Sequence, residues 1–136
     1  MDFRQLEKYQ PQLRAILRIM TALLFLEHGL AKLLQFPVPQ PGVPYPLPTI
    51  LVAAGVIEIV GGALITVGLF TRLVAFICAG EMAIGYYMFH FSKGGFWPIV
   101  NGGEAAILYC FVFLYLSAAG PGAWSLDGMR MKKPLP

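Results

Sequence analysis

Four glutamates stand out because each lies in a different apolar segment of the sequence: Glu27, Glu58, Glu81 and Glu104. An ionisable side chain at the centre of a membrane span costs at least ~2.5–3.5 kcal/mol on insertion scales, so such residues normally face the interior of the helix bundle or a water-filled cavity. A carboxylate there can carry a proton, pair with a cation, or hold helices together by hydrogen bonds. Glu58 and Glu81 fall near the middle of their segments, where neither a helix cap nor the membrane interface explains them.

Other polar residues lie in the same half of the predicted bundle. His28 adjoins Glu27, Lys32 follows His28 by four residues, and His90 ends the third apolar segment. At ~1.5 Å per helical residue, these groups concentrate in one half of the protein, beneath two connecting loops. We therefore expect a polar pocket in that half. Its candidate residues are Glu27, His28, Lys32, Glu58, Glu81, Asn101 and Glu104.

Some of these residues also have plain structural interpretations. Asn101 precedes Glu104 by three residues, as in a capping box that satisfies the first N–H groups of a helix. Lys32 either extends its ammonium to the lipid headgroups or serves as a counter-ion for Glu27. His90 fits a residue at the membrane interface as well as a pocket residue.

Metal and cofactor motifs are not found. Di-iron bundles use Glu-x-x-His pairs, and neither Glu27-His28 nor Glu81 with His90 has that spacing. Cys78 and Cys110 match no metal or disulfide pattern. The sequence predicts no metal site, no covalently bound cofactor and no self-contained catalytic motif, so whether the protein is an enzyme stays open.

Aromatic residues gather at the end of the third segment, which suggests two uses. A belt of aromatic side chains is typical of the membrane–water interface. The same side chains are also suited to a flat apolar ligand such as a quinone ring. In that interpretation the quinone or lipid contacts are Tyr86, Tyr87, His90 and Trp97.

The elements that must position these residues follow from composition. The 136 residues are 57% hydrophobic and 12% charged, against about 25% charged in soluble domains. Four apolar segments each approach the ~20 residues that span a bilayer as a helix. We expect an all-α integral membrane protein, an antiparallel bundle of four transmembrane helices. The segments are 13–34, 49–70, 73–91 and 102–119, flanked by cytoplasmic segments 1–12 and 120–136.

The breaks between the segments differ in character. Residues 35–48 contain six prolines and cannot continue a helix. The turn after the second segment is short and centres on Gly68 and Thr71. Glycines in the second and third segments predict close helix contacts. They are Gly55, Gly61, Gly62, Gly68, Gly80 and Gly85.

Basic residues predict the orientation. Eight of the ten Lys and Arg residues lie near the termini or in the 68–72 turn, and only Lys32 and Lys93 lie toward the other side. Lys and Arg favour the cytoplasmic side. We therefore expect cytoplasmic termini and a multi-pass protein of the cell inner (plasma) membrane. The net charge of +3 is an orientation signal and does not indicate nucleic-acid binding.

Several motifs resemble the DoxX family of small four-helix membrane proteins. They are FLEHGLAKLL around Lys32, the run from Glu58 to Arg72 with its paired glycines, Asn-Gly-Gly-Glu-x-x-x-x-Tyr from Asn101 to Tyr109, and Gly-Pro-Gly-x-x-Ser-x-Asp ending at Asp127. The resemblance covers about residues 18–127. It implies four membrane helices and, by analogy only, a component of a membrane redox system. The proline-rich loop departs from the family pattern and suggests a partner particular to this protein.

Three functions follow as hypotheses. The first is an accessory or quinone-associated subunit of a membrane oxidoreductase, with the lipid bilayer and other membrane or redox subunits as partners. The second is a structural or assembly subunit without chemistry, in which the glutamates bind helices together. The third is a small proton-coupled transporter that uses Glu58 or Glu81, for which no internal repeat is evident.

Overall fold

The computed structural model describes residues 2–131, and these residues form helices without a strand among them. The four long helices are α1 (Gln10–Leu34), α2 (Thr49–Val67), α3 (Thr71–Tyr86) and α6 (Glu104–Ala119). The shorter elements are the 3-10 helix η1 (Phe3–Tyr9), the π-helix η2 (Tyr87–Phe91), α4 (Ser92–Gly94), α5 (Pro98–Asn101) and α7 (Leu126–Met131). The all-helical prediction is confirmed for these residues. Lys132 and Lys133, which the orientation prediction also used, lie outside them.

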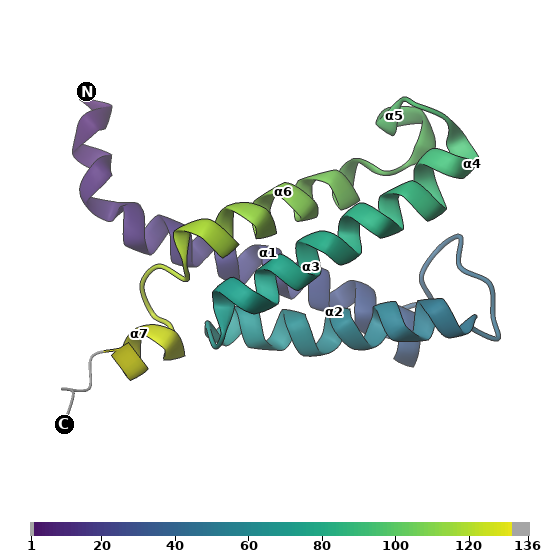
Figure 1. The fold of residues 1–136 in the computed structure, drawn as a ribbon, viewed down its shortest axis with the longest axis horizontal. Helices are drawn as coiled ribbons and strands as arrows, with labels where there is room; N and C mark the ends of the chain where they lie inside the picture. Colours follow the sequence, from purple (N-terminus) through teal and green to yellow (C-terminus); the bar gives the residue numbers. More distant parts are fainter. Residues whose placement is uncertain (1, 132–136) are drawn as a thin grey trace.

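The long helices form two pairs, α1 with α2 and α3 with α6 (Figure 1). The pairs meet at the turn between α2 and α3 and diverge away from it. The first and last described residues, Asp2 and Met131, lie toward the end where the pairs meet. The proline-rich loop 35–48 and the α4–α5 segment lie at the other end, which we call the outer end. Which membrane face each end occupies stays a prediction.

Several helices begin or end at other residues than the sequence predicts, because a glycine or a local hydrogen bond sets the end of the helix. α2 ends at Val67 and not at residue 70, because Gly68 adopts a left-handed φ of 72° and its N–H caps the helix. α3 begins at Thr71 and continues through η2 and α4 to Gly94, beyond the expected residue 91. α6 begins only at Glu104, because Gly102 has a φ of 74° and ends α5.

The capping box expected at the start of α6 is wrong. Gly103 is the N-cap of α6, and no side chain caps the helix there. Asn101 instead accepts a hydrogen bond from the Gly103 N–H at 2.8 Å and donates to the Tyr86 hydroxyl at 3.0 Å. It also donates to the carbonyl of Gly95. Asn101 therefore fastens the outer loop to α3.

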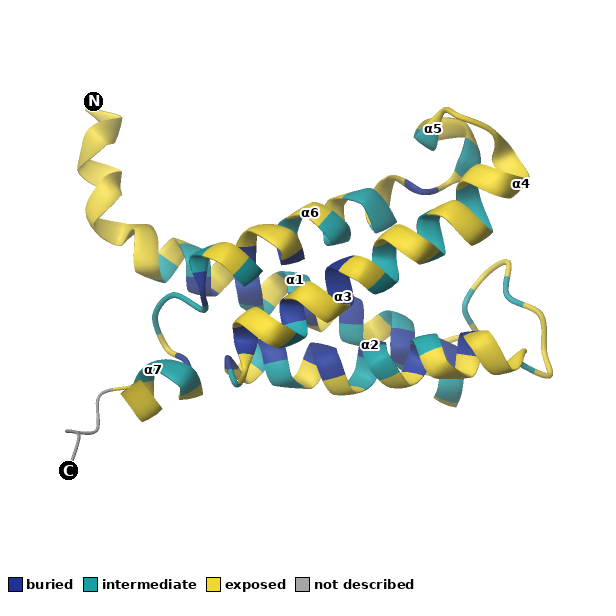
Figure 2. Ribbon diagram, viewed as in Figure 1, coloured by how far each residue is buried: buried dark blue, intermediate teal, exposed yellow. Residues whose placement is uncertain are grey.

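Large apolar side chains face outward along the long helices, as the exposed outer faces in Figure 2 indicate. Among them Phe76, Leu108 and Phe111 are each more than 60% exposed. Apolar surface of this extent is rare on soluble monomers and typical of contact with lipid or a partner. By length and composition, two helices are able to cross a membrane: Thr49–Val67 and Thr71–Gly94.

The other two long helices, α1 and α6, do not meet the same criteria of length and composition. α1 carries four charged residues, and α6 is apolar but has only 16 residues. The four-span prediction is therefore met in part by these criteria.

The closely packed core lies in the half of the protein nearer the termini. Phe25 and Phe113 contact edge to face with ring centroids 4.8 Å apart, and both are fully buried. Ile65, Cys78 and Leu116 belong to the same cluster. The outer half, where the helix pairs diverge, has no comparable cluster among the described residues.

Glycines set the distance between α1 and α2. A Cβ on Gly62 would lie 2.9 Å from the Cβ of Leu26 and 3.1 Å from the carbonyl oxygen of Ala22. The expected contact role of the α2 glycines is thus confirmed there. It is wrong for Gly80 and Gly85 in α3, where an added Cβ would meet nothing within 4 Å.

We expect Gly62→Ala to lower the free energy of unfolding by about 1–3 kcal/mol, because the methyl group forces α1 and α2 apart. Gly80→Ala is the matched control and should leave stability unchanged or raise it by up to about 1 kcal/mol, since the site is open and alanine favours the helix. Denaturant titration in mixed micelles measures both. Equal losses in the two variants would contradict this account of the α1–α2 contact.

The segment after α6 folds back around arginines that the sequence marked only as orientation signals. Arg18 is fully buried and donates to the carbonyls of Pro121, Ala123 and Trp124. Arg72 donates to the carbonyl of Ala118 at the end of α6. The predicted tail is therefore a docked part of the fold over residues 120–131.

Asp127 connects this segment to the start of α3. Its carboxylate accepts hydrogen bonds from the backbone N–H groups of Phe70 and Thr71, both at 2.8 Å. These are orphan donors at a helix N-terminus, and α3 has no cap from its own preceding residue. Partial burial pushes the pKa of Asp127 upward, but the hydrogen bonds from Thr71 and Phe70 and the charge of Arg130 outweigh it and hold the pKa below its ordinary value of 3.8.

Docking of this segment should consequently be lost in acid. A depressed carboxyl pKa contributes stability that is complete above the ordinary pKa and disappears as the pH falls through the lowered value. The amide protons of Phe70 and Thr71, which donate to Asp127, should keep their protection against hydrogen exchange, corrected for its intrinsic pH dependence, from neutral pH down to about pH 4 and lose it only below that pH. Asp127→Asn should show the reduced protection already at neutral pH and no acid transition. An identical acid transition in both proteins would rule out Asp127 as its source.

Candidate functional site

A cavity of about 730 Å³ occupies the outer half of the protein, between the diverging helix pairs. Its walls come from α1, α2, α3, η2 and α6, and residues 40–44 of the proline-rich loop lie over it. The expectation of a pocket beneath the outer loops thus has a geometric counterpart. Five of the predicted residues line this cavity: His28, Lys32, Glu58, Glu81 and His90.

A buried ion pair forms the polar centre of the cavity. The Lys32 ammonium of α1 contacts both carboxylate oxygens of Glu58 in α2, at 2.7 and 2.8 Å. Lys32 is 7% exposed and Glu58 1% exposed. Both expectations for Lys32 are therefore wrong, since it neither reaches the surface nor pairs with Glu27.

The geometry of α1 explains the partner. Lys32 lies five residues after Glu27, about 140° around the helix, so the two side chains point in different directions. Gly55 and Gly62 bring α2 close to α1, which places Glu58 against the face that carries Lys32. The rotation of α1 against α2 decides this contact, and the sequence of α1 alone does not reveal it.

Glu81 contributes a second carboxylate from α3. It lines the cavity, and its Oε2 atom is buried without a hydrogen-bond partner among the described residues. A buried polar atom without a partner is unusual and often indicates a functional role or an absent ligand. Glu81 is therefore the acceptor most available to a molecule in the cavity.

His28 and Tyr109 form the wall between α1 and α6. Their rings meet edge to face with centroids 5.8 Å apart, and both line the cavity. Phe25 lies beside Tyr109 at 5.6 Å. The residue-by-residue reasoning missed Tyr109 and Phe25, although Tyr109 closes the Asn-Gly-Gly-Glu-x-x-x-x-Tyr motif.

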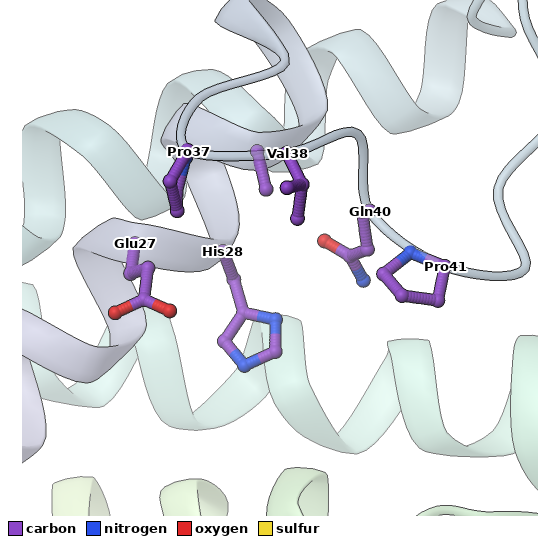
Figure 3. Close-up of a pocket in the computed structure, with 7 residues that line it drawn as sticks. Glu27, His28, Pro37, Val38, Gln40 and Pro41 are labelled. Carbon is purple, nitrogen blue, oxygen red and sulfur yellow. The ribbon is translucent and has the colours of Figure 1, made fainter.

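A smaller pocket of about 120 Å³ lies beside the cavity, toward the proline-rich loop (Figure 3). Glu27 and His28 of α1 line this pocket together with loop residues Pro37, Val38 and Gln40. His28 and Gln40 line both spaces, so they stand between the small pocket and the large cavity. The sequence reasoning also missed Gln40, the one amide that the loop places over the cavity.

The loop is held in place by Tyr45. Its hydroxyl donates to the carbonyls of Ala31 and Lys32 at the end of α1, at 3.0 and 3.2 Å. This fixes the loop next to the ion pair.

Other candidate residues lie elsewhere. Glu104 is exposed at the start of α6, and Asn101 holds the outer loop as described above. Tyr87 and Trp97 are 65% and 66% exposed and do not line the cavity. Tyr86 accepts a hydrogen bond from Asn101 and also lies outside the lining. Within residues 2–131, no group of three His, Cys, Asp or Glu residues is placed to hold a metal ion.

Comparison with known proteins identifies the family. The DoxX family model matches residues 13–91, which contain most of α1, all of α2 and α3, and both acidic cavity residues. The chain belongs to the DoxX family. This DoxX protein is 48% identical over 134 residues to an uncharacterised protein of Haemophilus influenzae, an alignment that covers 94% of this chain and 98% of that protein.

A second relative has a name that states its location. This DoxX protein is 30% identical over 127 residues to the inner membrane protein YphA of Escherichia coli, covering 87% and 90% of the two chains. No solved structure gives a significant match. Family and relative together identify the chain as a membrane protein, in agreement with its composition. The motifs at 101–109 and 120–127 lie beyond the range of the family model.

Proposed function

We propose that this DoxX protein is a multi-pass protein of the inner membrane in which α1, α2, the rod from α3 to α4, and α6 all cross the bilayer, with both termini cytoplasmic. Two of the four charges of α1 are compatible with a span, because Arg18 is buried against carbonyls and Lys32 is paired. α6 is about 24 Å long at 1.5 Å per residue, close to the hydrocarbon thickness. The relative named an inner membrane protein supports the location.

The cavity supports binding of a quinone. Its volume falls within the ~300–1,000 Å³ typical of small-molecule sites, and its lining is mostly apolar with a few polar groups. The Lys32 ammonium has three N–H donors and gives hydrogen bonds to two Glu58 oxygens, which leaves one donor for a quinone carbonyl. The Glu81 Oε2 atom is an acceptor suited to a hydroquinone hydroxyl. The donor thus serves a carbonyl of the quinone, and the acceptor serves a hydroxyl of the hydroquinone.

The corresponding role is an accessory or quinone-associated subunit of a membrane oxidoreductase. The sequence has no self-contained cofactor motif, so electron transfer requires a partner subunit. The single observation that carries the proposal is the cavity that holds both the Lys32–Glu58 pair and the partnerless Glu81 oxygen.

The test is a thermal shift in lipid nanodiscs. A bound ligand stabilises the folded protein by RT ln(1 + [L]/Kd), so a quinone at 100 times its Kd should contribute about 2.7 kcal/mol. Glu81→Leu should abolish the shift. Glu104→Leu is the matched control, because Glu104 lies outside the cavity and should leave the shift intact. A wild-type protein that neither retains quinone on purification nor shifts on its addition would defeat the proposal.

A structural role in a membrane complex is the second candidate, favoured by the tie between α1 and α2 through Lys32 and Glu58. In that case glutamine replacements of Glu27, Glu58 and Glu81 would lower the amount of assembled complex. The redox rate per intact complex would not change. The quinone proposal expects that rate to fall.

A further inference from the structure

The cavity continues from its polar centre to an apolar opening between α2 and α3. On α2 it is lined at one-turn intervals by Ile50, Ala54 and Ile57, which lead to Glu58. On α3 and η2 it is lined by Gly85 and Met88, which follow Glu81 at one-turn intervals. These rows are the facing sides of two helices that diverge toward the outer end (Figure 1).

Exposure distinguishes this side from the α1 wall of the cavity. Phe25 and Lys32, on the α1 side, are 0% and 7% exposed. Ile50 and Met88 line the cavity and are nevertheless 49% and 37% exposed. Residues that both line a cavity and face outward mark its opening. Since the outward faces of α2 and α3 are apolar, this opening leads to lipid.

We infer that the ligand of this cavity is a tailed amphiphile that enters sideways from the bilayer, with its polar ring at Lys32, Glu58 and Glu81 and its hydrocarbon tail between α2 and α3. This inference rests on the proposed function. A cavity of about 730 Å³ is larger than one six-membered ring fills, and the apolar rows form part of its lining. The tail buries apolar surface there, which a ring alone does not.

Gly85 lines the opening and has no side chain that would narrow it. An added Cβ would meet nothing within 4 Å, so a larger side chain at this position extends into the opening without a clash. Gly80 is a matched control in the same helix, because a Cβ there also meets nothing within 4 Å and Gly80 does not line the cavity. Both substitutions replace a helix glycine, so their effects on helix stability are alike.

The experiment measures affinities for two probes in nanodiscs: a dimethoxy-methyl-benzoquinone without a tail and its decyl derivative. Gly85→Leu should weaken binding of the decyl probe about tenfold, equivalent to about 1.4 kcal/mol, and leave the tail-less probe within about twofold. Gly80→Leu should change neither. Each variant is compared with wild type for the same probe, so partitioning of the probe into the bilayer cancels.

The outcomes separate this inference from the proposed function. If wild type binds neither probe, the quinone proposal itself fails. If wild type binds both but Gly85→Leu weakens them equally, or weakens neither, the ring site stands and the tail route is overturned. Loss of both probes in Gly80→Leu as well would also overturn it, because the effect would then not depend on the opening.

Discussion

Lys32→Met should lower the free energy of unfolding by about 3–5 kcal/mol, because it leaves the carboxylate of Glu58 buried without its cation. Glu58 is 1% exposed, and both of its oxygens contact Lys32. The measurement is denaturant unfolding in mixed micelles.

The double variant Lys32→Met/Glu58→Leu provides the decisive comparison. Replacing both partners of a buried ion pair by apolar residues of similar volume is often neutral or stabilising, so the double variant should recover most of the loss. Lys8→Met, at an exposed position in η1, should change stability by less than about 1 kcal/mol. A similarly small change in Lys32→Met would show that the pair is not buried as described.

Arg18→Met should cost about 3 kcal/mol, because it leaves three carbonyls of the segment after α6 without their shared donor and each unsatisfied acceptor costs about 1–3 kcal/mol if it stays buried. Those carbonyls belong to Pro121, Ala123 and Trp124. Relaxation of the segment into contact with water limits the total. Its undocking should appear as faster proteolysis after residue 120.

Arg18→Lys separates this role from the orientation signal. Lysine preserves the charge that orients the protein but lacks the planar fork that reaches three acceptors. We expect intermediate stability with unchanged topology. Arg4→Met, in exposed η1, is the control and should lower stability by no more than about 1 kcal/mol. Wild-type stability in Arg18→Lys would contradict the proposed clamp.

Local features of the chain were predictable where one segment decides them. Gly68 ends α2 because its φ is positive, and the six prolines of residues 35–48 exclude a helix there. The contact at Gly62 followed from its small size. Gly80 and Gly85 have the same size but face open space, because the divergence of the helix pairs is a property of the whole fold.

The functional residues were predictable as a set but not as pairs. Sequence depth placed Glu58, Glu81 and His28 in the same half of the protein, where they line one cavity. The partner of Lys32 depends on the rotation of α1 against α2. Glu104 lies in the same half but is exposed, which its position in the sequence does not reveal.

The motif that ends at Asp127 has a physical basis that only the fold shows. Gly122 approaches the backbone of α1, where a Cβ would lie 2.6 Å from the Pro11 carbonyl oxygen. Ser125 accepts a hydrogen bond from the Gly128 N–H, and Asp127 caps α3. The motif therefore docks the last helix across the start of α3, a long-range contact that local sequence patterns do not predict.

An experimental structure of the protein in nanodiscs that contain the reduced form of a quinone would test the cavity directly. We expect a hydroquinone in the outer cavity, with one oxygen within hydrogen-bond distance of the Lys32 ammonium and the other hydroxyl donating to Oε2 of Glu81. Quinone found only on the lipid-facing surface, beside a cavity closed by its own side chains, would contradict this expectation.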